Sequence, residues 1–334
     1  MNVAFLFLHP FSGSLGSSVR VRELSISLSK LGVSSHILSP YEKDRNIGDD
    51  IFVKNIPSIA GSFGLSSWMY KLSRLAYYNK SLVRRFLTSK RFQDLLANNI
   101  TRNAFKVFEE SEIDIVQAEQ DIAVPTSLKL ADKIKVPVVA DLHNIIAEEL
   151  VAADVVAKDS TEFRALQRLT AESLSQVDLV VVVSDEMKEY VSSEYDVSKS
   201  DIVVVPPGGQ PRIQEVKERA YPPKVVYAGL VGYREHVDLF VESMPMILKE
   251  RADVKFFVTK KGEKLRPIRA LARRLKVHPE YFWYSIEEEF YRFLASCHVG
   301  ALPSTNDLAR KMGTPVKLFD YMSVGLPVVA NDVR

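Results

Sequence analysis

The sequence alternates short apolar runs with longer segments of helical periodicity, and this alternation restricts the possible folds more than any other feature. The apolar runs lie at residues 3–8, 35–38, 51–53, 113–117, 136–140, 179–183 and 202–205, and again at 225–228, 254–258, 282–284, 299–302 and 327–330. They are rich in Val and Ile and lack strict apolar–polar alternation, as in strands that helices cover on both faces. We therefore expect an α/β protein with mostly parallel sheets.

A Pro- and Gly-rich segment interrupts this pattern between residues 206 and 223. It begins with the run PPGGQP, which continues neither a helix nor a strand. The chain has 334 residues, which is long for one compact core. We predict an N-terminal domain at 1–206, a linker at 207–223 and a C-terminal domain at 224–334. Because the chain ends directly after an apparent strand, we expect the C-terminal domain to be incomplete and the sequence to be a fragment.

Composition excludes several classes of protein. The 44 basic and 42 acidic residues nearly balance, which argues against a dedicated nucleic-acid binder. Cys297 is the single cysteine, so no internal disulfide forms, and a reducing, cytoplasmic location fits. The sequence has neither an apolar run of 18 residues nor a signal peptide. The histidines are scattered and no H-E-x-x-H motif occurs, so we expect no metal, and we interpret Asp49-Asp50 as a turn.

Residues 68–93 form a basic and aromatic stretch. It contains seven Lys or Arg, six aromatic residues and no acid, with apolar residues at helical spacing. Such a helix could lie on the inner face of a membrane as a peripheral contact, or hold an anionic acceptor such as a lipid-linked phosphate. It could equally be a solvated helix that packs its apolar stripe on the sheet.

A loop of small residues follows the first predicted strand. Residues 9–18 read HPFSGSLGSS and precede a predicted helix at 19–31, which Gly32 ends. Small residues before a helix N-terminus allow backbone N–H groups to approach phosphate or sugar oxygens, but an ordinary connecting loop has the same composition. No G-x-G-x-x-G motif follows the strand, which disfavours an NAD oxidoreductase.

The tetrapeptide Asp141-Leu142-His143-Asn144 directly follows the predicted strand at 136–140. It therefore lies at the carboxyl end of a parallel strand, where open α/β sheets bind ligands. His143 could exchange protons near neutral pH. Alternatively, the Asp or Asn caps a following helix and the histidine is incidental. No G-x-S-x-G nucleophile motif accompanies it.

Two segments of the C-terminal half suggest anion binding. Gly229 ends the predicted strand at 225–228 and would allow close backbone approach, and nearby Arg234 could contact a diphosphate with two parallel hydrogen bonds. Residues 315–322 predict a helix with Pro near its first position, so that its N–H groups point toward the preceding loop. Asp320 would lie more than one turn inside this helix.

Five segments together resemble the retaining family-4 glycosyltransferases, the "group 1" family with the GT-B fold. They are PVKLFDYMSVGLPVVAND, VDLVVVVSDEMKEYV, IVVVPPGG, VPVVADLHN and GSLGSSVRVRELSISLSKLG. The resemblance implies two Rossmann-like domains that face each other across a cleft. It also implies a nucleotide-sugar donor held mainly by the C-terminal domain, a glycan or lipid-linked acceptor on the N-terminal domain, retention of anomeric configuration, and no metal or other cofactor.

The same resemblance suggests roles for individual residues. Asp320 matches the carboxylate that binds the donor ribose, and His143 matches a histidine beside the transferred sugar. Arg234 and Lys317 would stabilise the departing diphosphate. The remaining donor-binding positions are Gly16, Gly229, Gly313, Thr314 and Leu318.

Three positions depart from the family pattern. Met312 replaces the first residue of the usual acidic pair, whose second member is shortened to Asp320. Leu230 and Glu235 stand where Arg and Lys are usual. Two alternatives therefore stay open beside the glycosyltransferase: a non-catalytic GT-B relative that binds or scaffolds a partner, and a sugar-nucleotide epimerase on the same fold.

Overall fold

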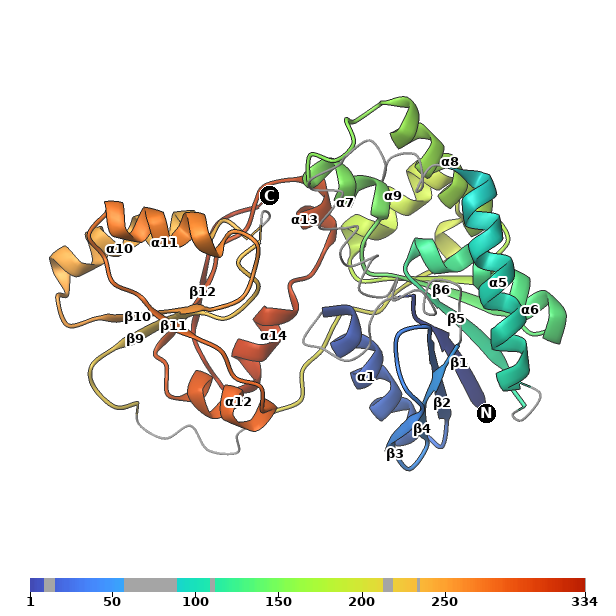
Figure 1. Ribbon diagram of the computed structural model, residues 1–334, viewed down its shortest axis with the longest axis horizontal. Helices are drawn as coiled ribbons and strands as arrows, with labels where there is room; N and C mark the ends of the chain where they lie inside the picture. Colours follow the sequence, from blue (N-terminus) through green and yellow to red (C-terminus); the bar gives the residue numbers. More distant parts are fainter. Residues whose placement is uncertain (9–15, 57–88, 109–111, 213–218, 233–234, 334) are drawn as a thin grey trace. The chain divides into compact units, whose positions relative to one another are not determined.

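The computed structural model describes residues 1–8, 16–56, 89–108, 112–212, 219–232 and 235–333. The chain divides into two compact units, each built on its own sheet (Figure 1). The first unit comprises Met1–Pro206 with Met312–Thr314, and the second comprises Pro207–Lys311 with Pro315–Arg334. Residues from Pro207 onward thus group with the second unit.

The first unit contains an eight-stranded sheet in the order β3-β4-β2-β1-β5-β6-β7-β8. Neighbouring strands run parallel except for the antiparallel pair β3 and β4. The strands are β1 (Asn2–Leu6), β2 (Ser34–Ser39), β3 (Arg45–Gly48), β4 (Ile51–Asn55), β5 (Ile115–Glu119), β6 (Val138–Leu142), β7 (Leu179–Val182) and β8 (Ile202–Val204).

Helices cover this sheet, and α5 packs against α6 (Figure 1). Serine side chains fix the start of two of them: Ser160 Oγ accepts from Phe163 N at 3.2 Å, and Ser184 Oγ from Met187 N at 3.0 Å. The helices are α1 (Gly16–Ser29), α5 (Lys90–Phe108), α6 (Val124–Ile134), α7 (Ile146–Ala152), α8 (Thr161–Leu174) and α9 (Asp185–Tyr195), with short 3₁₀ turns η1 (Asp121–Ala123) and η2 (Lys199–Asp201).

Each predicted apolar run of this unit overlaps an observed strand, but β3 was missed. All four β3 residues are exposed, so no apolar pattern marks it. It is an edge strand joined to β4 by a turn at Asp49-Asp50, which confirms the predicted turn.

The second unit contains a five-stranded, entirely parallel sheet in the order β11-β10-β9-β12-β13. Its strands are β9 (Lys224–Tyr227), β10 (Lys255–Thr259), β11 (Glu280–Phe282), β12 (Val299–Leu302) and β13 (Val328–Ala330). Its helices are α10 (Val237–Glu250), α11 (Leu265–Arg274), α12 (Glu287–Ala295), α13 (Leu308–Met312) and α14 (Val316–Ser323).

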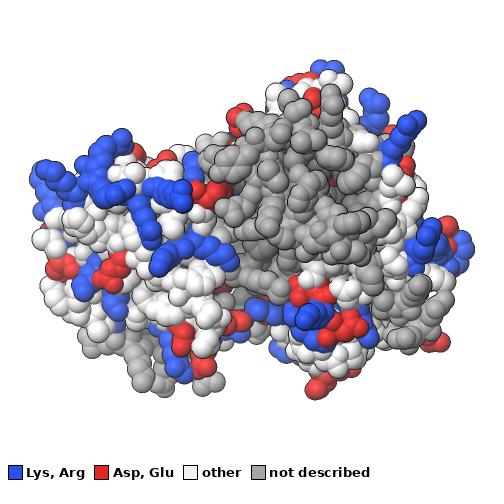
Figure 2. All heavy atoms as spheres, in the orientation of Figure 1, with Lys and Arg blue, Asp and Glu red and all other residues white. Residues whose placement is uncertain are grey.

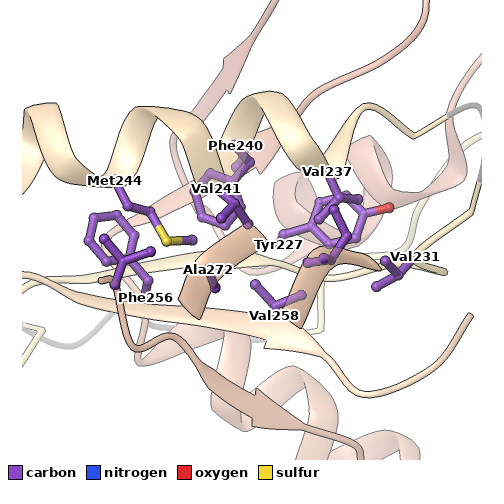
Figure 3. Close-up of a cluster of buried hydrophobic side chains, with 12 residues drawn as sticks. Tyr227, Val231, Val237, Phe240, Val241, Met244, Phe256, Val258 and Ala272 are labelled. Atoms are coloured by element: carbon purple, nitrogen blue, oxygen red, sulfur yellow. The ribbon is translucent and has the colours of Figure 1, made fainter. Parts of the chain in front are cut away.

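Apolar side chains cover both faces of this second sheet. On one face, α10 directs Val237, Val241 and Met244 onto the side chains of Tyr227 and Val258 (Figure 3). The opposite face packs a second buried cluster: Val226, Ala228, Phe257, Leu294, Cys297, Tyr321, Val324 and Leu326. This two-sided burial explains why the strands read as continuous apolar runs, since each fully buried side chain stabilises the fold by about 1.5–3 kcal/mol.

Tyr321 connects α14 to the second sheet, and its ring lies against a glycine of β12. Its hydroxyl accepts from Ala228 N at 2.8 Å and donates to Ala301 O at 3.1 Å. A Cβ atom added at Gly300 on β12 would lie 2.8 Å from Cδ2 of the Tyr321 ring. Gly300 therefore lets the ring lie against the strand.

We expect Gly300→Ala to destabilise the protein by about 1–3 kcal/mol, because the ring and its two hydrogen bonds must shift. A lower midpoint of urea unfolding with an unchanged slope would show this. Gly208→Ala is the matched control, because a Cβ atom there meets nothing within 4 Å. Equal midpoints for the two variants would contradict the prediction.

In the described part of the chain, no helix combines the length and apolar character needed to span a membrane.

Candidate active site

Each sheet has a point where the chain changes direction across it. In the first sheet, β2 lies on one side of β1 and β5 lies on the other. In the second sheet, β10 lies on one side of β9 and β12 lies on the other. Ligands of open α/β sheets bind beside the carboxyl ends of strands at such points. The loop after β1, residues 9–15, lies outside the described residues, and Gly16 is the exposed first residue of α1.

A buried ion pair holds α1 against β6 in the first unit. Arg20 Nε and Nη2 donate to Asp141 Oδ2 and Oδ1, each at 2.9 Å, and both side chains are almost completely buried. This two-pronged geometry is the strong form of a charge-assisted hydrogen bond. Asp141 therefore does not cap a helix, which rules out that interpretation for this residue.

Glu119 at the end of β5 shares this buried environment. Its Oε1 accepts from Gln117 Nε2 at 2.9 Å, and its side chain is fully buried. Burial and the adjacent Asp141 raise the pKa of Glu119 well above its ordinary value. Burial and the like charge of Asp141 therefore favour the protonated form of Glu119.

His143 lies at the carboxyl edge of the same sheet, one residue after β6. Its Nε2 is 2.9 Å from Gln120 Nε2, and its Nδ1 is 4.0 Å from Glu119 Oε2. With the Gln120 amide as donor, His143 Nε2 accepts and the ring proton lies on Nδ1, toward Glu119. The contact with Gln120 thus orients the ring.

Gln120 has backbone angles that favour glycine, with φ 71° and ψ 161°. A non-glycine residue in this region stores about 1–3 kcal/mol of strain, and such residues cluster at functional sites. No sequence motif marks this strain. It places the Gln120 side chain beside His143, and we take it as a further mark of a site here.

Asp121, the next residue, organises the start of α7. Its carboxylate accepts from the backbone N–H groups of Ile146, at 3.1 Å, and Ile122, at 3.0 Å, and from Thr170 Oγ1 at 3.3 Å. The residue at the N-cap of α7, Ile145, offers no such group. Burial raises the pKa of Asp121 to about 6.

This shift predicts a pH-dependent stability. Because the folded-state pKa of Asp121 lies above the ordinary 3.8, its contribution is fully present below pH 3.8 and is lost as the pH rises through about 6. We expect the free-energy difference between wild type and Asp121→Asn to favour wild type by about 2 kcal/mol more at pH 4.5 than at pH 7.5. Urea unfolding at both pH values measures it, and a constant difference would contradict the prediction.

In the second unit, Lys317 of α14 lies against the carboxyl end of β9. A Cβ atom added at Gly229 would lie 2.7 Å from Lys317 Cε, so a side chain at position 229 would displace the lysine. Lys317 Nζ donates to the Tyr227 hydroxyl at 3.3 Å and lies 5.1 Å from the centre of the Tyr227 ring. Gly229 N donates to Thr259 Oγ1 at 3.0 Å, which fixes the strand end.

Glu235 bridges two cations beside this strand end. Its Oε2 pairs with Lys317 Nζ and its Oε1 with Arg310 Nη2, and the three side chains are only 12–17% exposed. Burial alone would raise the pKa of Glu235, but Lys317 and Arg310 together lower it. Burial lowers the pKa of Lys317, and Glu235 opposes that effect. Arg310 was not identified from the sequence, because it lies 75 residues from Glu235.

Asp320 lies one turn after Lys317 on the same helix. Tyr291 donates its hydroxyl proton to Asp320 Oδ1 at 2.8 Å, and the Arg212 guanidinium lies 5.0 Å from the centre of the Tyr291 ring. Burial raises the pKa of Asp320. The helix begins at Val316 with Pro315 as its N-cap, so this proline lies next to the first helical position, as predicted.

The structure brings only some of the predicted site residues together. Gly229, Lys317 and Asp320 belong to one arrangement in the second unit, and Leu318 is half-buried on the same helix. Gly16, His143, Gly313 and Thr314 belong to the first unit. Arg234 and nearly all of the stretch 68–93 lie outside the described residues. Within the described residues, no group of three or more His, Cys, Asp or Glu is placed to hold a metal ion.

A basic surface on the second unit was also missed. Lys and Arg side chains gather over α11 and the residues that flank it (Figure 2). Eight of them fall within 17 residues that contain one acid, Glu263. They are Lys260, Lys261, Lys264, Arg266, Arg269, Arg273, Arg274 and Lys276. Such a surface attracts anions at long range.

Comparisons with known proteins agree with this architecture. Residues 15–209 match the family model described as Glycosyltransferase Family 4, and residues 222–334 match the one described as Glycosyl transferases group 1. A search of curated protein sequences finds no significant match.

Three solved structures show the same fold at low identity. Sucrose-phosphate synthase of Thermosynechococcus elongatus has a TM-score of 0.72 at 12% identity, over 98% of this chain and 80% of that one. HepE of Anabaena in complex with UDP-glucose has a TM-score of 0.65 at 11% identity, over 99% of this chain and 80% of that one. The catalytic domain of starch synthase IV of Arabidopsis thaliana, bound to ADP and acarbose, has a TM-score of 0.65 at 12% identity. The match covers 98% of this chain and 82% of that one.

Two units with mostly parallel sheets and these structural neighbours define the GT-B fold. Because one family model spans more than half of the 334 residues and the second covers most of the remainder, the chain belongs to the family-4, group 1 glycosyltransferases.

Proposed function

We propose that this protein transfers a sugar from a nucleotide-diphosphate donor to an acceptor hydroxyl, with retention of anomeric configuration. The bond between the anomeric carbon and the diphosphate oxygen breaks, and a bond from that carbon to the acceptor oxygen forms. The acceptor proton leaves with the nucleoside diphosphate. The observation that carries this proposal is the arrangement of Gly229, Lys317 and Asp320 at the direction change of the second sheet.

This arrangement suits a donor with an anionic leaving group. Lys317 places a largely buried ammonium group where the backbone of Gly229 leaves space, and fixed charges in such surroundings stabilise developing negative charge more strongly than water does. Asp320 would accept hydrogen bonds from the ribose hydroxyls. HepE of Anabaena with UDP-glucose, and starch synthase IV of Arabidopsis with ADP, bind ligands of this kind.

The first unit would hold the acceptor, a glycan or a lipid-linked sugar. His143 would position the transferred sugar, and its orientation by Gln120 suits a hydrogen-bonding role without nucleophilic attack. Gly16, Gly313, Thr314 and Leu318 would supply further donor contacts. The cations of the protein make a metal or other cofactor unnecessary, and the basic surface over α11 would raise the local concentration of anionic substrates. We place the enzyme in the cytoplasm, at or near the inner membrane face.

A non-catalytic binding or scaffold subunit is the second candidate. Met312 supplies no carboxylate where the family pattern has one, and Glu235 already occupies Lys317 and Arg310. Sugar transfer or donor hydrolysis by the full chain would exclude this candidate.

Asp320→Ala tests the ribose contact. We expect it to weaken binding of the preferred nucleoside diphosphate, chosen from UDP, GDP and ADP, by about tenfold, because a carboxylate–hydroxyl hydrogen bond is lost. The 2′,3′-dideoxy form of the same nucleotide lacks both hydroxyls. Isothermal titration should therefore show equal affinities of wild type and Asp320→Ala for it. An equal loss for both nucleotides would show that Asp320 acts elsewhere, and no nucleotide binding at all would contradict the proposed function.

A further inference from the structure

The ion cluster of Glu235, Lys317 and Arg310 carries more charge than the fold requires. One carboxylate divides its two oxygens between two cations, so the cluster holds a net charge of +1 in largely buried surroundings. Removing charged groups from water costs several kcal/mol per ion unless partners compensate it. An apolar set of side chains would stabilise this part of the unit equally well, so the cluster suggests a binding role.

The cluster lies where a ligand would bind. Lys317 is the second residue of α14, so its ammonium is close to the N-terminal turn of an eight-residue helix, and it contacts the end of the central strand β9. Strand ends at a direction change and helix N-termini both favour anionic ligands.

Arg310 retains an unused hydrogen-bond donor. Its Nη2 pairs with Glu235, whereas its Nε is buried and has no hydrogen-bond partner among the described residues. A buried donor without a partner is costly, so a second acceptor oxygen at this place would be stabilising. A single carboxylate that also serves Lys317 does not supply it, but a diphosphate, with more oxygens and more charge, can contact Nε, Nη2 and the lysine together.

The Glu235 side chain is placed so that it can move away from Lys317 and Arg310. It lies two residues before α10 begins at Val237, outside that helix. Its one further described partner is the Tyr227 hydroxyl, at 3.2 Å from Oε2. Movement of this side chain would therefore leave both the sheet and α10 intact.

We propose that Arg310 and Lys317 form the site for the donor diphosphate, and that Glu235 occupies it in the free protein as an internal anion that the diphosphate displaces. This inference rests on the proposed function for the identity of the ligand. It adds Arg310 as a binding residue and Glu235 as the residue that sets donor affinity.

The test compares binding of inorganic pyrophosphate and of UDP, GDP and ADP to the full chain by isothermal titration. Glu235→Gln should lower the Kd for pyrophosphate and for the preferred nucleotide by about tenfold, and Arg310→Gln should raise both by about tenfold. Lys311→Gln is the matched control, because Lys311 is the exposed neighbour of Arg310 on α13, and its Kd values should equal those of wild type.

Thermal unfolding gives a second readout in case Glu235→Gln is unstable. Without ligand the variant should melt below wild type, and pyrophosphate should raise its melting temperature more than that of wild type, because bound anion replaces the lost carboxylate. Arg310→Gln leaves Glu235 and Lys317 as a neutral pair, so its effect on affinity can be measured even if Glu235→Gln does not fold.

The outcomes separate this inference from the proposed function. Nucleotide binding that neither Glu235→Gln nor Arg310→Gln changes would overturn the diphosphate site and leave the function standing. Pyrophosphate binding that responds to both variants, with no nucleotide bound more tightly than pyrophosphate, would support the anion site and count against the function. Absence of binding by every variant and every ligand would overturn both.

Discussion

Lys317→Met is expected to weaken nucleoside diphosphate binding by about tenfold to a hundredfold, because it removes the ammonium group at the end of β9 while keeping an unbranched side chain of similar length. Methionine retains the contact with the Tyr227 ring. Isothermal titration of the full chain with UDP, GDP and ADP measures the change.

Two controls restrict the interpretation of this result. Lys311→Met removes an exposed lysine from α13, and its nucleotide affinity should equal that of wild type. Thermal unfolding without ligand shows how far Lys317→Met destabilises the unit by leaving Glu235 with Arg310 alone. A variant that folds like wild type and binds nucleotide equally well would remove Lys317 from the donor site.

Asp141→Leu is expected to destabilise the first unit by about 3–5 kcal/mol, because it leaves the Arg20 guanidinium buried without its carboxylate. The midpoint of urea unfolding should fall accordingly. The loss should be much larger than that from Lys135→Met, whose ion pair with Asp132 is exposed and contributes little.

The double variant Arg20→Met/Asp141→Leu separates the cost of an unpaired charge from the value of the pair. Replacing both members of a buried ion pair with apolar residues is often nearly neutral, so the double variant should recover most of the stability lost in Asp141→Leu. A double variant less stable than Asp141→Leu would contradict this account and would show that the Arg20–Asp141 pair is strongly stabilising in itself.

The fold could be predicted because each buried strand is marked by a local run of apolar residues in the sequence. The Val- and Ile-rich strands are buried on both faces, so residues such as Val226 and Tyr227 are apolar in succession and mark β9 directly. β3 escaped prediction because an exposed edge strand needs no apolar residue. The start of α14 was located to within one residue, because proline is favoured beside the first helical position.

The candidate site could be predicted only in part. Gly229 and Lys317 were found because motifs mark strand ends and helix starts. Arg310 and Arg20 were missed because their partners, Glu235 and Asp141, are brought to them only by the tertiary fold. The left-handed backbone of Gln120 was missed because glutamine carries no preference for it.

Turnover of nucleotide-sugars by the full chain tests the central claim most directly. Mass spectrometry of incubations with UDP-, GDP- and ADP-sugars, with glycan and lipid-linked acceptors present, would measure release of nucleoside diphosphate. We predict release from at least one donor. Release should be strongly reduced in Lys317→Met and unchanged in Lys311→Met. Release that is absent for every donor, or equal in wild type and Lys317→Met, would contradict a glycosyltransferase whose second unit holds the donor diphosphate.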